Sequence, residues 1–155
     1  MALLPLLMAL GASTTPQKAD VEGAWVCGPY QMQGTGMEIS AVDRPVYSPD
    51  GAYEELGFAT YTLPGGTEIR IETKLMGAWS LDDGIIEIRY TYAEFLSSDN
   101  PMLSVAAGQA GLDAKLQRKP WSKKRVVSHG PGSLVTIPLE VEDERAKVQV
   151  SCSRP

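Results

Sequence analysis

The chain has 155 residues, of which 43% are hydrophobic and 21% are charged, and this balance excludes an intrinsically disordered protein. The length fits a single globular domain with one core. The formal net charge of −5 argues against a nucleic-acid-binding protein, because most of the surface would repel phosphate.

The N-terminal segment is apolar over residues 1–12 and continues into small and helix-breaking residues. This pattern is typical of a signal peptide, and we expect one at residues 1–13, with cleavage after Ser13 or after Gly11. A buried N-terminal helix is the alternative interpretation. Residues 14–20 are then a flexible segment of an exported protein, either periplasmic or secreted. We expect no transmembrane segment in the mature chain, because no later stretch is apolar for long enough.

From residue 21 onward, polar and apolar residues alternate between tight-turn sequences, a pattern typical of half-buried antiparallel strands. The clearest turn signals are Pro49-Asp50-Gly51 and Asp82-Asp83-Gly84. We expect strands at residues 21–27, 36–43, 52–62, 67–75, 79–81, 85–95, 125–128, 134–141 and 146–152.

Two of these strands carry predictions about which residues share a face. In the strand at residues 85–95 the shared face consists of Ile86, Ile88, Tyr90 and Tyr92. In the strand at residues 134–141 the predicted inward residues are Val135, Ile137, Leu139 and Val141. Pro138 lies in the same strand, so we expect it at an edge or a bulge, where no amide donor is needed.

The alternation disappears between residues 97 and 121, where Asp99-Asn100-Pro101 precedes an alanine-rich segment. A polar N-cap residue followed by proline is a signal for the start of a helix. We therefore expect one helix here, packed on the sheet or partly irregular, because Gly108 and Gly111 lower its helix propensity.

The chain contains only two cysteines, Cys27 and Cys152, and in an oxidising compartment such an isolated pair usually forms a disulfide. A bond between them would place the first and last strands side by side, which closes an up-and-down sheet into a barrel. The sequence therefore predicts a mainly β protein. We expect an antiparallel up-and-down β-barrel of about eight or nine strands, with one helical insertion before the last strands.

Three short motifs carry a resemblance to a known family: Gly23-Ala24-Trp25, the Pro49-Asp50-Gly51 hairpin, and Gly77-Ala78-Trp79 leading into Asp83-Gly84. Together they resemble the small exported lipocalin-like, or calycin-like, β-barrel proteins. The resemblance implies a lipocalin-like domain over residues 21–155. It also implies that Trp25 plugs one end of the barrel and that a basic residue near the last strand, here Arg154, packs over its ring.

The sequence contains no pattern typical of an active site. Its single histidine, His129, lies in a turn, and both cysteines are expected to be oxidised, so neither nucleophilic catalysis nor zinc binding is expected. The acidic residues Glu54 and Glu55, and those at 140–144, are interpreted as solvent-facing rather than as an acid/base pair or a cation site. We expect no enzyme, no cofactor and no metal, with an enzyme that uses carboxylates inside the barrel as the least favoured hypothesis.

Two functional hypotheses follow. The first is a non-catalytic carrier that holds a small apolar ligand against the inward faces of the central strands. Its ligand-binding candidates are Phe58, Ile71, Trp79, Ile88 and Tyr90.

The second hypothesis is a module of the cell envelope, with a filled barrel, that binds or inhibits another protein. Six of the 14 basic residues lie between positions 115 and 125, a polarity that fits a docking surface. The interaction candidates are Lys119, Trp121, Lys123 and Lys124. A solvated helix end is the alternative interpretation of this segment.

Overall fold

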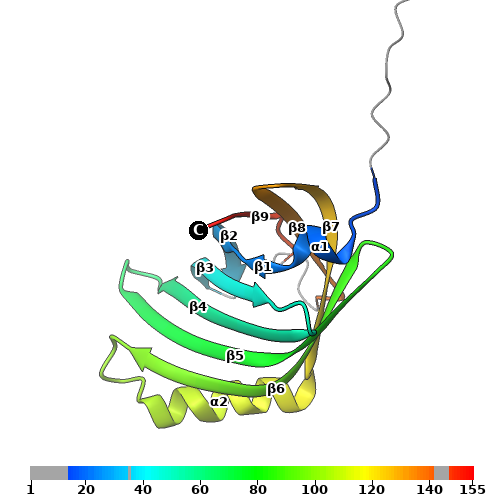
Figure 1. Ribbon diagram of the computed structural model, residues 1–155. Helices are drawn as coiled ribbons and strands as arrows, with labels where there is room; N and C mark the ends of the chain where they lie inside the picture. Colours follow the sequence, from blue (N-terminus) through cyan, green and yellow to red (C-terminus); the bar gives the residue numbers. More distant parts are fainter. Residues whose placement is uncertain (1–13, 35, 142–146) are drawn as a thin grey trace, which may run out of the picture.

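The structure is a computed structural model that describes residues 14–34, 36–141 and 147–155 (Figure 1). The predicted signal peptide, at residues 1–13, lies outside the described residues, as does residue 146, where the last strand was expected to begin. No helix in the described part of the chain is long and apolar enough to cross a membrane.

The described residues form a barrel of eight antiparallel strands with a short ninth strand attached to its edge, which confirms the predicted fold class. The pairing of β3 with β4 closes the sheet, and β1 adds to β3 outside the closed circle. The strands are β1 (Gly23–Ala24), β2 (Val26–Gly34), β3 (Met37–Tyr47), β4 (Ala52–Thr62), β5 (Glu68–Asp82), β6 (Ile85–Ser98), β7 (Trp121–Gly130), β8 (Ser133–Leu139) and β9 (Val150–Ser153).

A disulfide joins the first and last strands of the barrel. Cys27 on β2 lies directly opposite Cys152 on β9, and the two residues are bonded across a sequence separation of 125. The predicted disulfide is therefore confirmed, and so is the expectation that it joins neighbouring strands and helps to close the barrel.

One end of the barrel is closed by a tightly packed aromatic core. Trp25 is 1% exposed, and its Nε1 donates a hydrogen bond of 2.7 Å to the carbonyl oxygen of Val21, the last residue of the short helix α1 (Lys18–Val21). The guanidinium of Arg154 covers the indole ring. This is the arrangement that the resemblance implied for the two side chains.

Helix α2 (Val105–Arg118) lies along β6, on the side of the barrel away from α1 and β1 (Figure 1). It begins later than the proline signal suggested, because Asn100 organises a turn and Ser104 is the N-cap, accepting a hydrogen bond from the Ala107 amide. Its Gln109 side chain accepts from the Phe95 amide at 2.8 Å and donates to the Ala93 carbonyl at 3.0 Å. Strand β7 pairs only with the first residues of β6. The Gln109 side chain therefore supplies hydrogen-bond partners to backbone groups of β6 that β7 does not reach.

Several strand predictions were wrong in detail. The first expected strand, at 21–27, covers the last residue of α1, the short β1 and the first two residues of β2. Strand β2 then extends to Gly34, over residues 28–34 where no strand was expected. The two expected strands at 67–75 and 79–81 are one continuous β5. Its register with β6 shifts between Met76 and Gly77, where β6 has a bulge at Thr91. The same bulge moves Tyr92 off the face of Tyr90, and Tyr92 is 47% exposed.

The inward face of β8 was also assigned incorrectly, although Val141, just after the strand, lines the interior as expected. Leu134 and Thr136 are 1% and 4% exposed and point inward, so Val135 and Ile137 lie on the opposite face. The sequence of β8 is apolar on both faces, and the turn at Pro131 and Gly132 sets which face turns inward.

Candidate functional site

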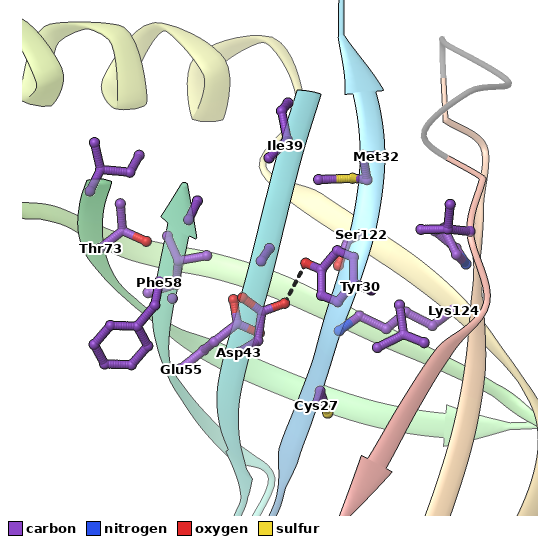
Figure 2. Close-up of a pocket in the computed structure, with 18 of the residues that line it drawn as sticks. Cys27, Tyr30, Met32, Ile39, Asp43, Glu55, Phe58, Thr73, Ser122 and Lys124 are labelled. Carbon is purple, nitrogen blue, oxygen red and sulfur yellow. Dashed lines mark hydrogen bonds between the residues drawn. The ribbon is translucent and has the colours of Figure 1, made fainter. Parts of the chain in front are cut away.

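The barrel interior contains a cavity of about 570 Å³ that borders the packed core, and Figure 2 shows part of its lining. Strands on all sides of the barrel and helix α2 contribute to its wall. The apolar part of the wall includes Met32, Ile39, Ala59, Ile71, Leu75 and Leu112.

Small side chains on neighbouring strands create this space. Ala41 on β3 pairs with Ala59 on β4, and Gly57 lies two residues before Ala59 on the same inward face of β4. A Cβ atom at Gly57 would lie 2.8 Å from Oγ1 of Thr73, so a larger residue at this position would have to displace the Thr73 side chain. Two adjacent strands thus face the interior with little side-chain volume, which leaves the barrel partly hollow.

The floor of the cavity is polar and titratable. Figure 2 places Tyr30, Asp43, Glu55 and Lys124 close together, and the Tyr30 hydroxyl donates a hydrogen bond of 2.6 Å to Oδ2 of Asp43. The Tyr53 hydroxyl, from the core below, donates to Oε2 of Glu55. A third pair is formed by the hydroxyls of Tyr90 and Ser122, 2.9 Å apart. We call Tyr30, Asp43, Glu55, Tyr90, Ser122 and Lys124 the polar floor.

Lys124 stays protonated although its ammonium group is enclosed by the barrel. Burial lowers the pKa of a lysine, because the charged form loses hydration. Here the neighbouring Tyr47, Glu55, Tyr90 and Asp43 favour the charged form more strongly, so the pKa of Lys124 lies above its ordinary value.

Asp43 has the opposite balance. Burial in the cavity and, after it, the negative charge of Glu55 raise its pKa to about 6, although the hydrogen bond from Tyr30 and the charges of Lys124 and Lys115 act in the other direction. Burial also raises the pKa of the Tyr30 hydroxyl, and that of Tyr90 to about 12, so both remain neutral donors near pH 7. The polar floor therefore carries charges that are only partly neutralised.

The five ligand-binding candidates are divided between two environments. Ile71 and Tyr90 face the cavity. Trp79 and Ile88 are 4% and 0% exposed in the packed core below it. Phe58 borders the cavity, but its ring points away in Figure 2 and lies 5.3 Å from the guanidinium carbon of Arg44.

The four interaction candidates, Lys119, Trp121, Lys123 and Lys124, are divided between the outside and the inside of the barrel. Lys119 and Lys123 place their Nζ atoms 4.6 Å and 5.2 Å from the ring centroid of Trp121, on the outer side of β7. Lys124 is the next residue on the strand and points into the cavity, because successive side chains of a strand face opposite sides. The four interaction candidates therefore do not form one surface.

Sequence reasoning interpreted Glu55 as solvent-facing and assigned no role to Asp43, whereas both residues line the cavity. A signal was present: Glu55 is in phase with Tyr53 and Ala59, which face inward. His129 lies elsewhere, with its Nε2 atom 3.0 Å from the Thr14 carbonyl oxygen. Among the described residues, no group of three or more His, Cys, Asp or Glu side chains is arranged to hold a metal ion.

No protein-family model matches the chain, and no curated protein matches it. The eight-stranded antiparallel barrel is consistent with a calycin-like fold. The argument for function therefore rests on the cavity and its polar floor.

Proposed function

We propose that the protein is an exported, non-catalytic, lipocalin-like binding protein that holds a small, largely apolar molecule inside its barrel. The observation that supports this proposal best is the cavity of about 570 Å³. Its volume falls in the range of roughly 300–1,000 Å³ that is usual for small-molecule sites.

The chemistry of the wall fits an apolar guest. Met32, Ile39 and Ile71 all line the cavity, so their apolar side chains are open to a guest. Each methylene group that a ligand buries against such a surface contributes about 0.8 kcal/mol of favourable free energy. The polar floor would fix the orientation of the ligand, since polar groups at one end of an apolar site can pair only with a polar group of the guest.

The alternative, an interaction module with a filled barrel, receives less support because the barrel contains a cavity. On the outer surface, Trp121 is already in contact with two lysines of its own chain. Neither observation indicates a particular protein partner.

The test is to titrate the purified protein with N-phenyl-1-naphthylamine, an apolar dye that fluoresces when it leaves water. Ala59→Phe places a large ring inside the cavity, whereas Ala78→Phe places the same ring on the exposed side of β5. The proposal predicts that the dye binds the unmodified protein and Ala78→Phe but not a folded Ala59→Phe. Equal binding to both variants, or no binding to the unmodified protein, would contradict it.

A further inference from the structure

We propose that the ligand of this cavity carries a protonated amine, bound beside Asp43 and Glu55 at the polar floor, with its apolar part directed toward Met32 and Ile39. This inference rests on the proposed function and narrows it to amphipathic cations.

The charges of the polar floor favour a cation. Two carboxylates and one lysine line the floor, which leaves one excess negative charge when all three are ionised. No lysine or arginine among the described residues lies in ion-pair contact with Asp43 or Glu55. A ligand ammonium group would supply the missing positive charge in a place where solvent screens it weakly.

Among the described residues, each carboxylate accepts a hydrogen bond on one of its two oxygens only. Oδ2 of Asp43 accepts from Tyr30, and Oε2 of Glu55 accepts from Tyr53, so that Oδ1 and Oε1 are not used by these tyrosines. An ammonium group has three donors and no acceptor, which matches a pair of acceptors better than a hydroxyl group does. Hydrogen bonds between ionised partners are also the stronger kind.

An anionic ligand fits less well. Its carboxylate could pair with Lys124, but that ammonium group already interacts with Tyr47 and Glu55. The same anion would lie close to both carboxylates of the floor, and burying like charges together is unfavourable. Lys115 adds a positive charge from α2, but this residue is exposed, so solvent screens its effect.

The experiment compares three ligands with one apolar chain: decylammonium, decanol and decanoate, measured by calorimetric titration at pH 7.5. We expect decylammonium to bind at least about tenfold more tightly than the other two, a difference of about 1.4 kcal/mol. Asp43→Asn and Glu55→Gln should each remove most of this preference and leave the affinity for decanol unchanged.

Lys124→Met provides a second, independent variant. It removes the competing cation, so decylammonium should bind as tightly or more tightly, and decanoate more weakly. Tighter binding of decanol or decanoate than of decylammonium to the unmodified protein would overturn the amine proposal while the proposed carrier function stands. Failure of all three ligands, and of the naphthylamine dye, would overturn the carrier function itself.

Discussion

The guanidinium of Arg154 lies over the indole ring of Trp25, with its carbon Cζ 3.6 Å from the ring centroid. Arg154 Nη1 also donates to the Ala24 carbonyl oxygen at 3.2 Å. A Cβ atom at Gly23 would lie 2.6 Å from the same Nη1, so the backbone approaches the guanidinium as closely as glycine allows. The second-last residue of the chain thus seals the end of the barrel where β1 begins.

Arg154→Ala should lower the free energy of unfolding by about 1 kcal/mol, because a partly desolvated cation–π contact contributes roughly that amount. Arg70→Ala is the matched control, since the Arg70 side chain is 66% exposed and its ion pairs are on the surface. Urea unfolding measures both. An equal effect of the two substitutions would contradict the sealing role of Arg154.

Reduction of the Cys27–Cys152 disulfide should destabilise the protein strongly. The bond spans 125 residues of sequence. In the chain-entropy model, closing a loop of that length stabilises a fold by about 5 kcal/mol. Urea unfolding with and without reductant should show a large shift of the midpoint, and the Cys27→Ala/Cys152→Ala variant should match the reduced protein. An unchanged midpoint would contradict the predicted stabilisation by this bond.

Two glycines of α2 provide a matched pair for testing how the helix docks. A Cβ atom at Gly108 would lie 2.5 Å from the ring of Phe95, whereas one at Gly111 would meet nothing within 4 Å. Gly108→Ala should therefore lower the melting temperature, and Gly111→Ala should raise it, since alanine favours a helix by about 1 kcal/mol over glycine. The same sign of change in both variants would contradict the close contact between α2 and β6.

The pH dependence of stability should report the buried Asp43. Its pKa is raised from 3.8 to about 6 in the folded protein, where it faces Tyr30, Glu55, Lys124 and Lys115. Between these pH values the folded state binds a proton that the unfolded chain does not bind. This contribution to stability therefore falls as the pH rises from about 4 to about 6, and stays lost above that.

Asn cannot ionise, so Asp43→Asn removes the free-energy cost of burying a charged carboxylate. The variant should therefore be more stable than the unmodified protein near pH 7, by about 1 to 3 kcal/mol. Its stability should also lack the fall between about pH 4 and pH 6. Urea unfolding across this range is the measurement. Parallel pH profiles for the two proteins would contradict the raised pKa.

The strands that follow strong turn signals could be predicted from the sequence. The Pro49-Asp50-Gly51 turn fixes the start of β4, and the predicted strand at 52–62 has the same bounds as Ala52–Thr62. The segment at Gly28 and Pro29 shows no alternation, because the register between β2 and β3 shifts there, so the part of β2 after Cys27 was not predicted.

The polar part of the cavity could not be predicted, because charged residues in alternating strands are usually assigned to the solvent-facing side. Asp43 and Glu55 are charged and lie on inward positions, and Lys124 points inward from within a basic run. Whether small residues such as Ala41 and Ala59 leave a cavity depends on their pairing across β3 and β4, which one sequence does not reveal.

Methyl NMR of the methionines tests ligand binding inside the barrel most directly. Met32 lines the cavity, whereas Met76 and Met102 are 37% and 90% exposed on the outside. Addition of decanol should shift the Met32 methyl signal in a saturable manner and leave those of Met76 and Met102 unchanged. If the Met32 signal does not move, or if only Met76 and Met102 respond, the ligand does not enter the barrel and the account is wrong.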